Sequence, residues 1–420
     1  MSENRTVTAA ESSRNVSIIG SVPVTLLGGS KGAADAFGRL RVSEPDTLFD
    51  SKQLFDNQPL FWDDQEVSGG STSSTHSVNE AASTIGVGAT TAGRRIRQTF
   101  QRFNYQSGKS QLSFLTFVLD DSGGGTGITR GVGLYDDNNG LFLKDDEGTI
   151  KLVRRTYVTG SAVDNEVEQS AWNLDVMDGT GASGITIDFT KTHILVIDFE
   201  WLGVGRARMG FNIDGVTHYV HEFLNANNLS LVYMSTPNLP FRYEIENDGT
   251  GAASTLMHIC TAIMCEGGVQ NLGVLRHIDS SAISGLSTGV TYAMLGIKLK
   301  TSYIGSSSLI ENISMISTTN NDQLHWELIM NPTIAGTFTY ANQTNSAVKI
   351  ATGSSSNTVT GGIEIDGGYL STSLPLTNTI PNALKLGSAI DGTRDEIVLC
   401  ARPITNNITV ESSLTWRELS

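Results

Sequence analysis

The sequence predicts an all-β protein: two antiparallel β-sandwich domains preceded by an extended N-terminal arm. Apolar and polar residues alternate with a period of two over stretches of about six to nine residues, which is the pattern of half-buried strands. Short turns rich in Asp, Asn and Gly, such as DDNNG (136–140) and DDEG (145–148), separate these stretches. Such residues tolerate the positive φ angles of tight hairpins. A parallel sheet would need a helix between successive strands, and SAWNLDVM (170–177) offers one or two helical turns at most.

Length and composition agree with a folded chain of many short strands. The 420 residues suffice for two or three domains of about 100–200 residues each. Hydrophobic residues make up 39% and charged residues 17% of the chain, and 44 residues are Gly. A disordered chain would carry more charge and fewer aromatic residues.

The strand patterns divide the chain into three parts. Residues 1–60 form the predicted arm, in which NVSIIGSVPVTLLGG (15–29) is too short to bury a core and must pair with another element or another subunit. Residues 61–275 form the first predicted sandwich, beginning with a loop and a peripheral strand at 67–92. Residues 276–420 hold eight strand patterns, enough for a second sandwich of the jelly-roll type.

The end of the arm carries the residues that we predict to act in attachment and oligomerisation. Arginines alternate with aliphatic residues there, so one face can contact apolar surface while the other meets carboxylates. Large apolar residues further on would fix the arm to the first sandwich or to an adjacent copy. The predicted interaction residues are Phe37, Arg39, Leu40, Arg41, Val42, Leu48, Phe49 and Phe55. The alternative is that this stretch is only the first strand and loop of the first sandwich.

Charge and cysteine content exclude several classes of protein. The formal net charge is −15, whereas nucleic-acid binding needs clustered Lys and Arg. No apolar run reaches the roughly 18 residues of a membrane span, so no membrane insertion is predicted. The N-terminus lacks the pattern of a secretion signal. Cys260, Cys265 and Cys400 cannot build a disulfide framework and are predicted to be reduced thiols, mostly buried.

Candidate sites for chemistry each have a simpler structural explanation. Acidic residues two apart on strands could divide acid and base roles as in glycosidases, but they are also common on exposed strand faces. These pairs are Asp198 with Glu200, Glu244 with Glu246, and Glu364 with Asp366. The loops 136–139 and 145–147 offer oxygen ligands for calcium, yet hairpin chemistry explains both. We therefore predict no catalytic residue, no metal and no cofactor. Carbohydrate binding stays open without assigned residues.

Three stretches resemble one family. They are DAFGRLRVSEPDTLFDSKQ (35–53), VIDFEWLGVGRARMGFNIDGVTHYVHEF (196–223) running into VYMSTPNLPFRYEIEN (232–247), and SSLTWREL (412–419). Together they resemble virion structural proteins of tailed bacteriophages and large algal viruses, described as structural, fibre-like or minor capsid components. The resemblance covers most of the chain from Asp35 onward. The middle portion is also similar in strand pattern to laminin-G and concanavalin-like sandwiches.

The resemblance implies a non-enzymatic virion component, made in the host cytoplasm and carried in the virion. We expect a head or tail fibre, spike or decoration subunit. Its expected partners are other copies of itself in a homotrimer or another symmetric oligomer, other virion proteins, and a host surface glycan. The alternative is a carbohydrate-binding or polysaccharide-degrading receptor-binding protein of a virus.

Overall fold

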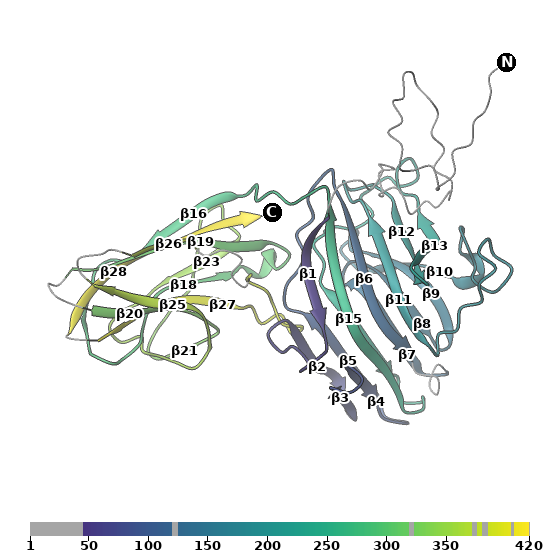
Figure 1. The fold of residues 1–420 in the computed structure, drawn as a ribbon, viewed down its shortest axis with the longest axis horizontal. Helices are drawn as coiled ribbons and strands as arrows, with labels where there is room; N and C mark the ends of the chain where they lie inside the picture. The colour runs from purple at the N-terminus through teal and green to yellow at the C-terminus, as the bar shows by residue number, and fades with distance from the viewer. Residues whose placement is uncertain are drawn as a thin grey trace, which may run out of the picture.

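The computed structural model describes residues 45–119, 125–318, 323–371, 376–379, 385–404 and 407–419. Over these residues the regular structure consists of antiparallel strands apart from two single 3₁₀ turns, Gln169–Ala171 and Thr301–Tyr303. The strands form two groups of sheets that lie side by side along the long axis of the molecule (Figure 1). The predicted all-β class is confirmed.

The first group is built from two large sheets that enclose one core. Sheet 1 has the order β13-β12-β11-β6-β15-β4-β3, with β1 also paired to β15: β13 Val216–Phe223, β12 Ala207–Ile213, β11 Thr192–Phe199, β6 Ser110–Leu119, β15 Ser254–Glu266, β4 Ala82–Val87, β3 Thr72–Ser77 and β1 Asp46–Lys52. Sheet 2 has the order β10-β9-β8-β7-β14-β5-β2: β10 Val163–Glu168, β9 Thr149–Thr156, β8 Gly140–Asp146, β7 Ile128–Tyr135, β14 Phe241–Asn247, β5 Gly93–Thr99 and β2 Trp62–Gly69.

The second group is smaller and is built in the same way. Sheet 3 has the order β16-β28-β19-β26, with β17 also paired to β28: β16 Val274–Asp279, β28 Ile408–Leu419, β19 Ser307–Ser317, β26 Leu376–Thr379 and β17 Ile283–Leu286. Sheet 4 has the order β22-β23-β18-β27-β20-β25: β22 Ala341–Asn342, β23 Val348–Thr352, β18 Tyr292–Leu299, β27 Glu396–Pro403, β20 Gln323–Met330 and β25 Ile363–Ser371. A two-stranded ribbon joins β21 Thr333–Ile334 to β24 Val359–Thr360.

Local turn chemistry explains the hairpins that the sequence predicts. Between β8 and β9, Glu147 and Gly148 have φ angles of 54° and 89°, as a two-residue hairpin turn requires. Between β7 and β8, the Asp136 carboxylate accepts the backbone N–H groups of Asn138 and Asn139 at 2.8 and 2.9 Å. Both turns fall where DDEG and DDNNG predict them.

The alternation of residue types fills two separate cores. In the first sandwich, Phe49 of β1 lies 5.2 Å from Phe103 and 6.2 Å from Phe241, measured between ring centroids. The second core contains Trp326 and Trp416, on strands from its two sheets. Each aromatic side chain of this size buries a large apolar area, and aliphatic residues fill the rest of both cores.

A charged group also lies inside the first sandwich. Arg97 of β5 has no solvent-exposed side-chain area and donates to Gln53 Oε1 at 2.9 Å, His258 Nδ1 at 3.2 Å and Asp64 Oδ2 at 3.3 Å. Burial, together with the nearby charge of Arg97, holds the pKa of His258 well below its usual range. The imidazole is therefore neutral and can accept from the guanidinium at Nδ1, while Nε2 lies 3.0 Å from the Thr261 hydroxyl.

The two sandwiches touch through a loop of the second in addition to their covalent connection (Figure 1). Ser388 donates its backbone N–H to Phe100 O at 2.9 Å, and its hydroxyl accepts from Arg102 at 2.8 Å. Ile390 donates its backbone N–H to the Asp63 carboxylate at 2.7 Å. If another residue replaced Gly387, its Cβ atom would lie 2.4 Å from Phe100 O, so this close approach requires glycine.

Some strand assignments differ from expectation. The stretch 67–92, expected to be a loop with a peripheral strand, contains β3 and β4, and β4 is largely buried between β15 and β3. One of the eight strand patterns predicted in 276–420 is GTFTYAN (336–342), but only Ala341–Asn342 of it pairs. Phe338 and Tyr340 instead pack edge to face over Gly296. Of SAWNLDVM (170–177), only Ser170 and Ala171 are helical, in the single 3₁₀ turn Gln169–Ala171.

No helix among the described residues is both long and apolar enough to cross a membrane.

We expect Arg97→Met to lower the free energy of unfolding by about 3 kcal/mol, because it leaves Gln53 Oε1 and His258 Nδ1 without their buried donor. Urea denaturation followed by tryptophan fluorescence measures this change. Lys191→Met is the control, because Lys191 is exposed and its single ion pair, with Asp188, is long at 4.0 Å. This substitution should change the free energy of unfolding by less than about 0.5 kcal/mol. Equal effects of the two substitutions would contradict a structural role for the buried arginine.

Candidate functional site

The predicted interaction residues fall partly outside the described chain. Phe37, Arg39, Leu40, Arg41 and Val42 lie outside the described residues. Of the others, Leu48 and Phe49 belong to β1, and Phe49 is buried in the core of the first sandwich. The part of the predicted arm from Asp46 to Lys52 is therefore a strand of sheet 1, which follows from its ladder with β15.

Phe55 lies beyond β1, and 86% of its surface is exposed. It is the most exposed large apolar side chain among the described residues. A fully exposed aromatic ring is costly to leave in water. Its contact with an adjacent copy stays a prediction.

The first predicted carboxylate pair is tied to basic and backbone groups. Asp198 forms an ion pair with Arg208 and accepts from the Tyr219 hydroxyl at 2.9 Å, and none of its surface is exposed. Glu200 accepts the backbone N–H of Arg206 at 3.0 Å. Between and beside these acids, Ile197 and Phe199 are buried in the core, and the partly buried Trp201 packs against that core.

The second and third pairs have different surroundings. Glu244 lies 2.7 Å from Arg94 and 3.3 Å from Arg242, and Glu246 lies 3.9 Å from Arg94. Glu364 and Asp366 lie on β25, where the register with β20 shifts between Leu328 and Ile329. Because of this bulge the two carboxylates stand opposite adjacent residues of β20, and the regular alternation that would align them is broken.

The carboxylates of the two oxygen-rich loops, 136–139 and 145–147, form hairpin hydrogen bonds and ion pairs within the protein. Asp137 lies 2.6 Å from Arg242, and Asp145 lies 2.7 Å from Arg130. Asp145 also accepts the backbone N–H of Gly148 at 2.9 Å. Within the part of the chain that the structure describes, no three His, Cys, Asp or Glu side chains gather as a metal site would need.

The three cysteines are free thiols. Cys265 and Cys400 are buried, and Cys260 is half-buried. Burial raises the pKa of both buried thiols above the usual value. A raised pKa leaves little thiolate at neutral pH, so these groups are inert.

One surface cluster combines an exposed aromatic ring with hydrogen-bonding groups, and sequence reasoning missed it. Tyr369 of β25 is 73% exposed, and its ring centroid lies 4.6 Å from that of His325. His325 Nδ1 lies 2.7 Å from Glu327 Oε1 and 3.0 Å from Arg402 Nη2. Adjacent strands in register bring these residues together, since Tyr369 and Arg402 both pair with His325. We call these four residues the Tyr369 cluster.

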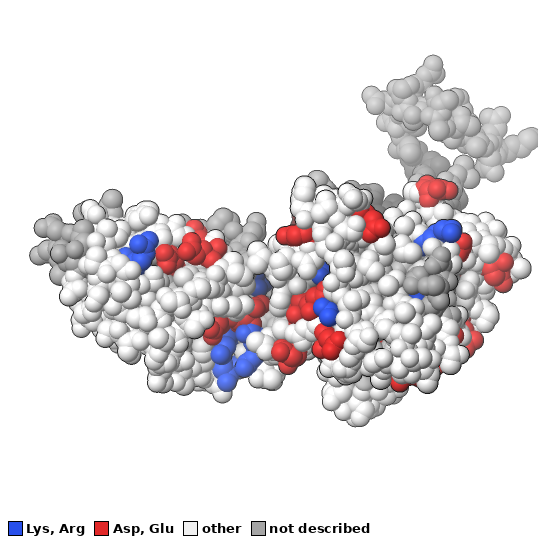
Figure 2. Space-filling model, turned by 90° about the horizontal axis from the view of Figure 1, so that it is seen from below, with Lys and Arg blue, Asp and Glu red and all other residues white. Residues whose placement is uncertain are grey.

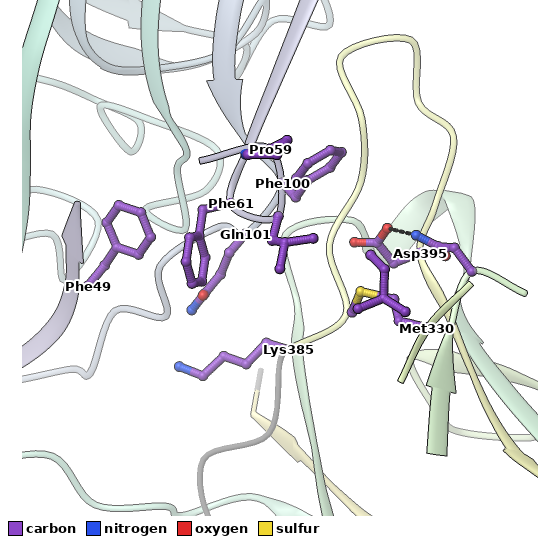
Figure 3. A pocket seen from close by; sticks show the side chains of 11 residues that line it. Phe49, Pro59, Phe61, Phe100, Gln101, Met330, Lys385 and Asp395 are labelled. Atoms are coloured by element: carbon purple, nitrogen blue, oxygen red, sulfur yellow. Dashed lines mark hydrogen bonds between the residues drawn. The ribbon is translucent and has the colours of Figure 1, made fainter. Parts of the chain in front are cut away.

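A cavity at the junction of the sandwiches is the second feature that the sequence did not reveal. Phe49, Phe61 and Phe100 form one wall, and the second sandwich contributes Lys385 and Asp395. Figure 3 shows Asp395 and Met330 across the opening from Phe49 and Phe61, with the Lys385 side chain extended alongside. The enclosed space is about 70 Å³, room for a few water molecules.

Burial shifts the pKa of both charged groups at this cavity. It raises the pKa of the Asp395 carboxyl, although Asn331 and the backbone N–H of Gly387 donate to it at 2.8 and 3.1 Å. It lowers the pKa of Lys385. Acidic and basic side chains also gather on the surface where the sandwiches meet, and large areas elsewhere on that face carry neither (Figure 2).

No protein-family model matches the chain, and no curated protein matches it. Among solved structures, it is similar to a glycoside hydrolase family protein from Mycobacterium thermorestibile, with 11% identity over 51% of this chain and 99% of that chain and a TM-score of 0.36. It is similar to the carbohydrate recognition domain of Emp47p, with 10% identity over 53% and 97% of the two chains and a TM-score of 0.34. It is also similar to the CBM2 module of the evolved Dit of Lactobacillus casei BL23 phage J-1. That likeness has 6% identity over 54% of this chain and 99% of that chain, with a TM-score of 0.34. Likenesses this distant assign neither a family nor an activity.

We expect Lys385→Met to raise the free energy of unfolding at pH 6 by about 1 kcal/mol, because it removes a charge held partly away from water. The folded-state pKa of Lys385 is lowered, so the unfolded chain binds more protons up to the usual lysine pKa of about 10.4. Wild-type stability therefore rises with pH through that window, and the advantage of the variant shrinks. Thermal unfolding at pH 6 and pH 10, with Lys191→Met as control, measures this; a gain that is the same at both pH values would contradict it.

Proposed function

We propose that the chain is a non-enzymatic structural protein of a virion: a head or tail fibre, spike or decoration subunit that attaches through its N-terminal segment and presents its sandwiches outward. The observation that carries the proposal is the junction between the two sandwiches. They are held by the connection between β15 and β16 and by the 387–390 loop, which bonds to Phe100, Arg102 and Asp63. Two separate attachments restrict hinge motion and favour an elongated unit that transmits force.

The position where the described chain begins also supports this role. The Asp46 carboxylate accepts the backbone N–H of Val269 at 2.5 Å, so β1 starts beside the connection between the sandwiches. β1 therefore begins near the middle of the molecule, beside the junction (Figure 1). A segment attached there can reach a neighbouring subunit while both sandwiches stay exposed.

The ion pairs of the acidic residues fit a structural role better than a hydrolytic one. Asp198 pairs with Arg208, and Glu244 pairs with Arg94 and Arg242. Glycoside hydrolysis needs one carboxyl with a raised pKa opposite a carboxylate that faces the substrate. In this chain the Asp198 and Glu244 carboxylates are both held by arginine side chains instead. The resemblance of 35–53, 196–247 and 412–419 to virion structural proteins points the same way.

Deleting residues 1–34 tests this proposal. We expect virions that carry the deletion variant to incorporate at least tenfold less of this protein than virions with the full chain, by quantitative mass spectrometry of purified particles. The control lacks only residues 1–14 and keeps the apolar stretch 15–29; it should incorporate normally. Melting temperatures of both variants check the fold. A folded Δ1–34 variant that incorporates as well as the full chain would sink the proposal.

A second candidate function is carbohydrate binding at the host surface, which the Tyr369 cluster favours. An exposed aromatic ring can stack on the apolar face of a sugar, and adjacent polar groups can bond its hydroxyls. The partly exposed Arg402 supplies donors, and the buried Glu327 carboxylate holds His325 and Arg402 in place beneath the ring. This reading extends the structural role, because a fibre or spike that binds its host needs such a surface.

We expect Tyr369→Ala to weaken glycan binding at least tenfold on a glycan array, because the stacking surface is lost. Tyr303→Ala is the matched control, since Tyr303 is also an exposed tyrosine of the second sandwich but lies outside the cluster. Glycan binding that is unchanged by Tyr369→Ala, or a wild-type protein that binds no glycan, would count against this candidate.

A further inference from the structure

We propose that residues 16–27 of a neighbouring copy add to the free edge of β16 as an extra strand. This inference rests on the proposed function, in which the N-terminal segment joins subunits, and it names the surface that receives the segment. Residues 16–27 themselves lie outside the described residues.

The free edge of β16 is the first support. β16 ends sheet 3, and among the described strands only β28 pairs with it. Continuing the same register, Ser280 donates its backbone N–H to Ser412 O at 2.8 Å. Antiparallel strands alternate residues that face the partner strand with residues that face away. Even-numbered residues of β16 therefore face β28, and the backbone N–H and C=O groups of Leu275, His277 and Asp279 point to the free side.

Apolar side chains accompany these unpaired backbone groups. Val274 and Leu275 at the start of β16 are 60% and 53% exposed, and Leu272 just before them is 80% exposed. Leu272 also lines a groove of about 250 Å³ with Tyr105 and Leu419, which continues from β16 toward the first sandwich. An edge that combines free backbone groups with exposed aliphatic side chains is a template for strand addition.

The described chain begins close to this edge. The described chain begins at Pro45, and Asp46 is bonded to Val269, five residues before β16. Residues 28–44 then connect the segment to β1, and 17 extended residues span at most about 60 Å. On every copy, the start of β1 therefore lies close to the acceptor edge, within reach of the linker of a neighbouring copy. Head-to-tail exchange between copies can close a symmetric ring.

The sequence of the segment suits an added strand. Val16, Ile18, Val22, Val24 and Leu26 occupy even-numbered positions of the segment, and three of the residues between them, Ser17, Ser21 and Thr25, are polar. Pro23 has no backbone N–H to give, so it must face away from β16, on the new outer edge where proline is tolerated. That orientation directs the backbone of Val22 and Val24 toward β16 and places their side chains on the face that carries Leu275.

Hydrogen exchange and light scattering on the purified full chain test the proposal. We expect peptides covering 274–280 to exchange at least tenfold more slowly in the full chain than in the Δ1–34 variant. A synthetic peptide of residues 14–29 should restore the protection when added to that variant. His277→Pro, which removes an outward N–H, should convert the oligomer to monomers, whereas His277→Ala keeps that N–H and should stay oligomeric. In the segment, Val24→Asp should also convert the oligomer to monomers, whereas Ser21→Asp, on the opposite face of the added strand, should leave it oligomeric.

Three results would overturn the proposal. Equal exchange at 274–280 in the full chain and in Δ1–34 would show that the segment does not bind this edge. A monomer with a protected edge would show that the segment docks on its own copy. An oligomer with an unprotected edge would place the contact elsewhere and would leave the proposed function standing, because particle incorporation of Δ1–34 is measured separately.

Discussion

Among the described residues, each of the four large sheets ends in two strands whose outer backbone groups lack a strand partner, and these edges differ in what surrounds them. At β13 the edge is covered, because the backbone N–H groups of Leu174 and Asp175 both donate to Val220 O at 3.0 and 3.1 Å. The edges at β10, β2 and β25 carry acidic side chains, which discourage pairing with another strand. At β16 exposed aliphatic residues stand beside the free backbone groups instead.

The same edge lies close to the joint of the molecule. Asp46 at the start of β1 contacts the connection that leads into β16, and β1 anchors this region to the first sandwich through its ladder with β15. On the other side, the 387–390 loop holds the second sandwich against Phe100 and Asp63. Forces applied to the N-terminal segment would therefore reach both sandwiches near their junction, without first passing through the core of either one.

Much of the fold follows from the sequence because local chemistry decides it. DDNNG and DDEG dictate their hairpins, and alternating residues in 192–199 place Ile197 and Phe199 in the core. Alternation alone could not show that Arg97 points inward, because an arginine at a core position is recognisable only from its partners on other strands. The residues around β4 are small and polar, so the sequence did not reveal that this strand is buried. Its burial depends on its partners β15 and β3 in the sheet. The Tyr369 cluster depends on the register of three strands distant in sequence, and the junction cavity on the packing of two sandwiches; neither leaves a local signal.

Site-directed disulfide formation between two differently tagged populations tests the exchange of N-terminal segments most directly. In a Cys260→Ser background, one population carries Val24→Cys and the other carries Leu275→Cys. The account predicts that mild oxidation of the mixture joins the two tags covalently, and that Ser21→Cys, on the opposite face of the added strand, does so far less. A mixture that never joins the two tags, while a single chain with both Val24→Cys and Leu275→Cys closes an internal disulfide, would contradict it.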